Sequence, residues 1–233
     1  MRILIARIRR FASGVPFYRW PIEFYRNRRA SAARGSRKKE KLKEIRRFDR
    51  KHGVDFGGYI PPDALGNHSV GGNAYEPSYP MPNLLKSLRV FEDDCLLDVG
   101  CGKGYAMYCF AALPFSRIDG LEYSHRLAKT ARSNLAKLFP GSDRFRVYEG
   151  DAALWSDYDR YTYVYLYNPF KAHVVEKVCC ELAESLKRAP RRLTVVYQAP
   201  FHWDVLRAYG FLPVMQMDGA AVFTPGPDLS RIA

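Results

Sequence analysis

The chain has 233 residues, of which 47% are hydrophobic, and a formal net charge of +13. This length and apolar content exclude a disordered or fibrous protein and allow one α/β domain with an appended segment. The charge is uneven, because residues 1–51 hold 18 Lys and Arg against four acids and the remaining residues sum to −1. We therefore expect a near-neutral domain that carries a basic N-terminal arm.

The cysteines and the apolar runs bear on the cellular compartment. No apolar run reaches the roughly 18 residues of a membrane span, and arginines interrupt the apolar residues that a signal peptide would need. The cysteines are odd in number and lack the spacing of metal ligands, so we expect reduced thiols, no metal site and a cytoplasmic protein. They are Cys95, Cys101, Cys109, Cys179 and Cys180.

Residues 1–51 are predicted to form a basic amphipathic helical arm. On a helical wheel, the apolar residues from Leu4 to Val15 fall on one side and four arginines on the other, and an aromatic patch that includes Trp20 follows. Our hypothesis is that residues 1–29 dock on an anionic membrane, at its inner face. Packing on the protein's own domain or a second subunit, and binding to nucleic acid, are the alternatives.

The second half of the arm is predicted to be a separate helix. The small residues from Ala30 to Gly35 predict a hinge. Ser36 then predicts the N-cap of a helix that runs to about Lys51 and ends at Gly53. Its inner face carries three apolar side chains, Leu42, Ile45 and Phe48.

Residues 52–94 are predicted to form a loop-rich lid and a connecting helix. Glycine and proline are too frequent from His52 to Pro62 and from Asn67 to Pro82 for long regular elements. Loops of this length in a compact protein are usually functional or disordered, and tyrosines such as Tyr75 favour order. The connecting helix is expected from Asn83 to Val90.

A glycine-rich turn after a strand is the main functional signal. The run from Cys95 to Val99 predicts a buried strand, and the residues from Tyr105 predict a helix. Between them lie Gly100, Gly102 and Gly104, which allow the chain to reverse with positive φ close to a ligand, and the unpaired N–H groups at the start of the following helix favour an anionic group. A dinucleotide fingerprint would need glycine where Tyr105 stands, so the spacing disfavours a nicotinamide enzyme.

Together with the preceding Asp98, this turn resembles motif I of class I S-adenosylmethionine-dependent methyltransferases. In that family, the motif holds the amino-acid end and the ribose of S-adenosyl-L-methionine. The resemblance implies five cofactor-binding residues here, Asp98, Gly100, Cys101, Gly102 and Gly104.

Two further strand ends complete the expected cofactor site. A second strand ends at Glu122, and a carboxylate about 20 residues after the glycine turn can accept both ribose hydroxyls. We therefore expect Glu122 to bind the ribose, next to Tyr123. After a third strand, Gly150-Asp151-Ala152 resembles the segment that lines the adenine in these methyltransferases, with Asp151 receiving the exocyclic amine. A turn-forming Asp is the alternative.

The fourth strand, Tyr161 to Tyr167, is expected to lead to the methyl acceptor. It ends in Asn168-Pro169-Phe170, and ligands of open α/β sheets bind beyond the carboxyl ends of strands. The tripeptide resembles, with one proline fewer, the Asn-Pro-Pro-aromatic motif of amide and amine N-methyltransferases, and a bacterial group of methyltransferases shares its Tyr-Asn-Pro-Phe ending. The resemblance implies that Asn168 and Pro169 accept hydrogen bonds from the target nitrogen while Phe170 stacks on the substrate beside Tyr167. A strand-terminating turn is the alternative.

The lid also resembles that bacterial group and, more distantly, the non-SET histone lysine methyltransferases. In the latter, a comparable Tyr/Glu segment folds over the cofactor. The resemblance implies cofactor contacts for Tyr75 and Glu76. Tyrosines that only pack are the alternative.

The C-terminal residues predict a closing β-hairpin. Two strand-like runs, Phe211 to Met217 and Ala220 to Thr224, flank Asp218-Gly219, a strong hairpin signal. Methyltransferases of this class end their seven-stranded, Rossmann-like sheet with one antiparallel strand. We therefore expect residues 95–233 to form a catalytic domain of this α/β fold.

The sequence thus predicts a methyltransferase that uses S-adenosyl-L-methionine and N-methylates an unidentified acceptor. The alternative is a non-catalytic cofactor-binding protein that docks to an anionic membrane or nucleic-acid surface. Production of S-adenosylhomocysteine would separate the two.

Overall fold

The computed structural model describes residues 28–65, 72, 74–77, 82–167, 170–217 and 219–230. Its strands are β1 (Cys95–Val99), β2 (Arg117–Glu122), β3 (Phe145–Glu149), β4 (Tyr163–Tyr167), β5 (Thr194–Gln198), β6 (Phe211–Met217) and β7 (Ala220–Pro225). Its helices are α3 (Arg28–His52), α4 (Pro62–Leu65), α5 (Pro82–Ser87), α6 (Tyr105–Phe110), α7 (His125–Leu138), α8 (Ala172–Arg188), α9 (Trp203–Ala208) and α10 (Pro227–Ser230).

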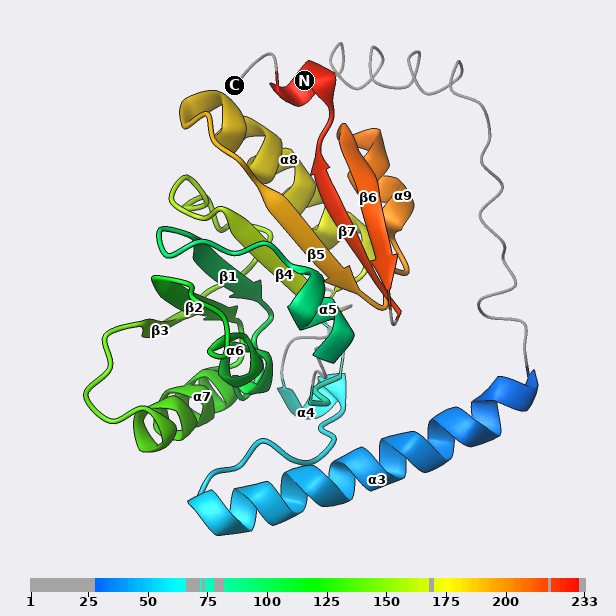
Figure 1. Ribbon diagram of the computed structural model, residues 1–233, viewed down its shortest axis with the longest axis vertical. Coiled ribbons are helices and arrows are strands. Elements are labelled where there is room, and N and C mark those ends of the chain that lie inside the picture. The colour runs from blue at the N-terminus through cyan, green and yellow to red at the C-terminus, as the bar shows by residue number, and fades with distance from the viewer. Residues whose placement is uncertain are drawn as a thin grey trace.

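The seven strands form one sheet in the order β3-β2-β1-β4-β5-β7-β6 (Figure 1). Strands β1 to β5 pair in parallel, whereas β7 is antiparallel to both β5 and β6. The predicted Rossmann-like sheet with one antiparallel strand is confirmed. The chain moves outward in one direction from β1 to β3 and in the other from β4 to β5, so the carboxyl ends of β1 and β4 flank the switch point where such sheets bind ligands.

Strand alternation places an apolar layer on each face of the sheet. Leu97 and Val164 pack with the buried face of α8, whereas their strand neighbours Leu96 and Tyr163 pack with α6 and α7. Successive side chains of a strand point to opposite faces, and an apolar residue at every position is what a sheet covered by helices on both sides requires. The helices therefore hold the strand ends rigidly around the switch point.

Helix α3 is one continuous helix of 25 residues, so the predicted hinge from Ala30 to Gly35 is wrong. Alanine, lysine and arginine favour a helix, and one internal glycine costs only about 1 kcal/mol. The expected end is confirmed, because α3 stops before Gly53, which has φ +65°. Its C-terminal half packs through Ile45 and Phe48 on Phe56 and on α6, while the rest of the helix extends away from the sheet (Figure 1).

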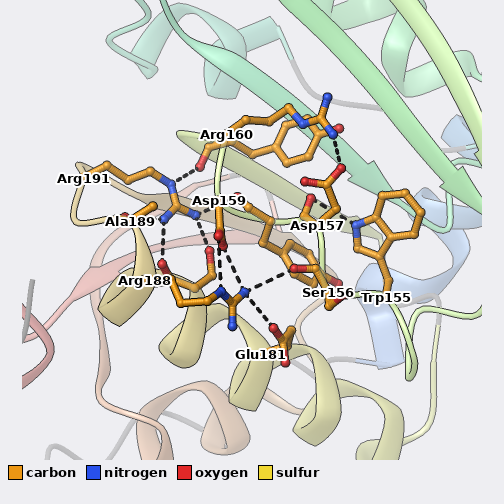
Figure 2. A network of polar contacts seen from close by, with 12 residues as sticks. Trp155, Ser156, Asp157, Asp159, Arg160, Glu181, Arg188, Ala189 and Arg191 are labelled. Carbon is orange, nitrogen blue, oxygen red and sulfur yellow. Dashed lines mark hydrogen bonds and ion pairs between the residues drawn. The ribbon is translucent and has the colours of Figure 1, made fainter.

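The amino-terminal edge of the sheet is held by arginine contacts (Figure 2). Arg191 donates to the carbonyl oxygens of Tyr158 (2.7 Å) and Tyr161 (2.8 Å) and to the Ser185 hydroxyl of α8 (2.9 Å). Arg188 donates to the carboxylates of Asp159 and Glu181 at 2.9 and 2.8 Å. These contacts fix the loop that precedes β4. Strand β4 begins two residues later than predicted, at Tyr163.

Candidate active site

A cavity of about 410 Å³ lies at the carboxyl edge of the sheet, beside the switch point, within the size range of small-molecule sites. Most of the residues predicted to form the site line this cavity. They are Tyr75, Glu76, Asp98, Gly100, Cys101, Gly102, Glu122, Tyr123, Asp151, Ala152, Tyr167 and Phe170. Predicted Asn168 and Pro169 lie outside the described residues, as does the amphipathic helix predicted around Leu4 to Val15.

Asp98 is the most unusual group in the cavity. Its side chain is 2% exposed, and its Oδ2 has no hydrogen-bond partner among the described residues. Burial, and next the nearby Glu122 carboxylate, raise the pKa of Asp98 well above its ordinary value. A buried carboxylate oxygen without a partner is costly in free energy unless a ligand supplies the missing hydrogen bond or charge.

Glu122 connects the end of β2 to the glycine turn. Its Oε2 accepts the Gly102 N–H and its Oε1 accepts the Ser124 N–H, both at 2.8 Å. Burial raises its pKa, and these two hydrogen bonds oppose that shift. The sequence indicates a ligand-binding acid at this position, but not that the same carboxylate also holds the turn in place. Each oxygen can accept a second hydrogen bond, so a ribose hydroxyl can still be bound there.

Four amides of the glycine turn are hydrogen-bonded within the protein. The amides of Gly100 and Cys101 donate to the Leu121 carbonyl oxygen, and the amide of Gly104 donates to that of Cys101. With Gly102 bonded to Glu122, these amides are already used inside the protein. The turn therefore allows a ligand to come close to the backbone, beside the carboxylates of Asp98 and Glu122.

Gly102 and Gly104 are needed for different reasons. A Cβ on Gly102, which has φ +57°, would lie 2.4 Å from the Tyr75 ring, so the lid tyrosine covers the turn directly. A Cβ on Gly104, which has φ +83°, would instead press on Ala131 of α7 at 3.3 Å. Gly104 is absent from the cavity lining described here, and its role is to let α6 pack against α7.

The thiol of Cys101 is buried, and this burial raises its pKa well above the ordinary value. A thiol that stays protonated is a poor nucleophile, so its contribution to the cavity wall is one of packing. Asp151 receives the Ala153 N–H on Oδ1 at 2.8 Å, which is the pattern of a turn-forming aspartate, and it also lines the cavity next to the buried Ala152. Tyr123 is 41% exposed at the cavity mouth.

Glu76 and Tyr167 meet where β4 ends. The Tyr167 hydroxyl donates to Glu76 Oε1 at 3.0 Å, although the two residues are 91 positions apart. Gly72, from the same lid segment, forms a bridge with Phe170. The lid thus brings a carboxylate to the strand end at which the acceptor is expected.

Several lining residues carried no recognisable sequence signal. Tyr59 and Phe201 are more than half exposed at the cavity, and Ala199 adopts the left-handed conformation (φ 49°) that is uncommon for residues other than glycine. The turn at Ala199 follows β5 and leads the chain to Phe201. A single alanine after a strand gives no hint of this conformation.

The cavity lining is strongly acidic in a basic protein. Its described side chains include four carboxylates, those of Glu76, Asp98, Glu122 and Asp151, and no Lys, Arg or His. Among the described residues, no group of three or more His, Cys, Asp or Glu could hold a metal ion. The acidic lining favours a positively charged ligand.

No helix in the described part of the chain is long and apolar enough to cross a membrane.

Comparison with known families supports the methyltransferase class expected from the sequence. Residues 96–189 match the model of the family described as "Methyltransferase domain". This match over residues 96–189 and the sheet topology support a methyltransferase domain of the class I, Rossmann-like fold around the cavity. No curated protein matches the sequence significantly.

Solved structures with the same fold are distant in sequence. A Methanococcus maripaludis protein assigned to the S-adenosyl-L-methionine-dependent methyltransferases shares 13% identity at a TM-score of 0.50, over 62% of this chain and 82% of its own. The PH0226 protein of Pyrococcus horikoshii shares 18% identity at a TM-score of 0.48, over 62% and 86%. A segment named StiE O-MT shares 14% identity at a TM-score of 0.45 over 57% of this chain, which spans half of that segment.

Proposed function

We propose that this protein is an S-adenosyl-L-methionine-dependent methyltransferase that acts on an amine nitrogen. The observation that carries the cofactor assignment is the buried Oδ2 of Asp98, which has no partner among the described residues, in a cavity whose described lining holds four carboxylates and no cation. S-adenosyl-L-methionine carries a sulfonium and an ammonium group, which such a lining attracts. A nicotinamide dinucleotide carries a pyrophosphate, which the same carboxylates would repel.

Three of the predicted cofactor residues have a defined part in this proposal. Asp98 would pair with a cationic group, Glu122 would accept ribose hydroxyls with its remaining lone pairs, and Asp151 would lie along the adenine. When bound, the cofactor would supply a methyl group attached to a good leaving group. The enzyme's contribution is then chiefly proximity, alignment and exclusion of water.

The choice of nitrogen as acceptor rests on Glu76 and Tyr167. Their hydrogen bond places a carboxylate and a phenol near Phe170, at the strand end where Asn168 and Pro169 are expected to orient the acceptor. An amine enters as a cation, which a carboxylate and aromatic rings attract, and it must lose a proton before it can attack. Glu76 is the group that would take this proton. A non-catalytic binding protein would not need such a pair.

Calorimetry tests the cofactor, with S-adenosylhomocysteine and NADH as separate titrants. We expect binding of the first and none of the second. NADH binding without S-adenosylhomocysteine binding would overturn the assignment.

A transfer assay with tritiated cofactor and lysate fractions tests the acceptor. We expect a labelled product that survives mild base, as N-methyl groups do and methyl esters do not. Glu76→Gln should lower turnover about 100-fold at saturating cofactor while the affinity for S-adenosylhomocysteine stays within about twofold. A base-labile label would exclude nitrogen as the acceptor.

We also retain the proposal that residues 1–29 bring a cytoplasmic enzyme to an anionic membrane surface. It is supported by the arginines opposite the apolar residues from Leu4 to Val15. Co-sedimentation of the full chain with anionic and neutral vesicles tests it. Binding that is specific to anionic vesicles and weakens with salt is expected, and equal recovery with both would overturn it.

A further inference from the structure

Lys103 lies inside the glycine turn but is not among the described residues that line the cavity. Its side chain is 8% exposed, and its ammonium group donates to Asp55 Oδ1 at 2.6 Å and to the Gly57 carbonyl oxygen at 2.7 Å. Both acceptors belong to the segment that follows α3. The turn predicted to hold the cofactor therefore also binds residues 54–60 of the lid.

Asn134 of α7 strengthens this junction from a second direction. Its amide nitrogen donates to the carbonyl oxygens of Asp55 (2.9 Å) and Lys103 (3.1 Å), and its Oδ1 accepts the Asp55 N–H at 2.9 Å. On the other side, the Asp49 carboxylate of α3 accepts the amides of Phe56 and Gly57 at 3.1 and 2.8 Å. Residues 55–57 are thus bonded to α3, to α7 and to the glycine turn.

The same segment holds Tyr75 over the turn. The Tyr75 hydroxyl donates to the Phe56 carbonyl oxygen at 2.6 Å, and its backbone pairs with Ile60 in both directions, at 2.8 and 3.0 Å. The Tyr75 ring lies where a Cβ of Gly102 would be, and Lys103 Nζ lies 5.3 Å from the centre of that ring. A movement of residues 55–57 would therefore move the ring that covers the cofactor turn.

We propose that Lys103 is a positioning residue, which holds residues 54–60 and through them Tyr75 against the glycine turn, so that the lid retains the bound cofactor. This rests on the proposed function only for the identity of the ligand. Lys103 is buried and Asp55 is exposed, and the loss of either partner should loosen residues 54–60. Neither residue is among the described residues that line the cavity, so neither loss removes a group that touches the reacting atoms. The predicted effect falls on cofactor retention and leaves the chemical step unchanged.

Amide hydrogen exchange on the full chain without ligand tests the structural half. Lys103→Met keeps the length of the side chain and removes the cation, and we expect exchange in peptides covering residues 53–60 to rise about tenfold. The matched control is Lys137→Met, because Lys137 donates to the Gly53 carbonyl oxygen at 2.6 Å but does not contact the turn. The control should leave exchange at residues 55–57 unchanged.

Binding and turnover test the functional half. Lys103→Met should weaken S-adenosylhomocysteine binding about tenfold, while turnover at saturating cofactor stays within about twofold. Unchanged exchange, or a loss of turnover with unchanged affinity, would overturn the proposal. If Lys103→Met fails to fold, Asp55→Ala removes the acceptor of the same contact at an exposed side chain, and both the exchange and the affinity should change about threefold in the same directions. If the native protein itself binds no S-adenosylhomocysteine, the proposed function fails, and the exchange result still decides whether Lys103 holds the segment.

Discussion

Two buried aspartates lie near opposite ends of strand β1, and they differ in their hydrogen-bond partners. Asp94, at the amino end, receives the Phe91 N–H, the Thr162 hydroxyl and two hydrogen bonds from Arg192 at 2.5 and 2.6 Å. Asp98, at the carboxyl end, has an oxygen without a partner among the described residues and a raised pKa. The first carboxylate is neutralised inside the fold, whereas the second remains available for a ligand.

The same contrast holds for the two edges of the sheet. At the amino edge, Arg188 and Arg191 satisfy the carboxylates and carbonyl oxygens of the loop before β4 (Figure 2). At the carboxyl edge, carboxylates gather around the cavity without a described lining cation. Carboxylates with raised pKa values that gather around a cavity are typical of a functional site, and the arginine contacts at the other edge supply the rigidity that such a site needs.

The largest expected effect is on ligand affinity. Asp98→Asn should weaken S-adenosylhomocysteine binding about 100-fold, because a charged hydrogen-bond acceptor is lost in a buried site. Asp94→Asn is the matched control at the other end of the strand and should change affinity by less than about twofold. Calorimetry on both variants measures this, and equal losses would mean that the two ends do not differ in function.

Stability should respond in the opposite sense. Asp94→Asn breaks the contact with Arg192 and should lower the free energy of unfolding by about 2 kcal/mol. Asp98→Asn removes an unpaired buried carboxylate and should raise it by about 1 kcal/mol. Urea unfolding monitored by circular dichroism gives both values. A loss of stability in Asp98→Asn would show that its carboxylate already has a structural partner.

The pH dependence of stability and of ligand affinity should show the effect of Asp98 at the carboxyl edge. The folded-state pKa of Asp98 lies above its ordinary value, so its contribution to stability is fully present below about 3.8 and is lost as pH rises through the raised pKa. Affinity for a cationic ligand should rise over the same window, because only the ionised carboxylate attracts it. Parallel urea and binding series across pH measure both slopes, and Asp98→Asn should remove them. Slopes that persist in Asp98→Asn would assign them to another group.

The smallest effect is expected in the arginine network of Figure 2. Arg188 is nearly half exposed, so its ion pairs with Asp159 and Glu181 are screened by water. Arg188→Ala should lower the free energy of unfolding by at most about 1 kcal/mol and leave ligand affinity unchanged. Thermal unfolding with and without S-adenosylhomocysteine checks both statements, and a changed ligand-induced shift would contradict the second.

The sequence by itself determined the fold class and the cavity residues of the strand ends. Short apolar runs, the glycine turn after β1 and the Asp218-Gly219 signal are local patterns in the sequence, and each has a local backbone preference that predicts its structure. The resemblance to motif I indicated Asp98, and the interval of about 20 residues after the glycine turn indicated Glu122. The hinge in α3 was predicted wrongly because helix propensity summed over 25 residues outweighs one glycine and a serine.

Only the tertiary structure decided which distant residues meet. Lys103 and Asp55 are 48 positions apart, and Glu76 and Tyr167 are 91 apart, yet each pair shares a hydrogen bond. No periodicity relates such positions, because their contact depends on how the segment between α3 and β1 packs across the finished sheet. The use of the turn amides inside the protein was likewise hidden, since it depends on where the carboxylate of Glu122 points after folding.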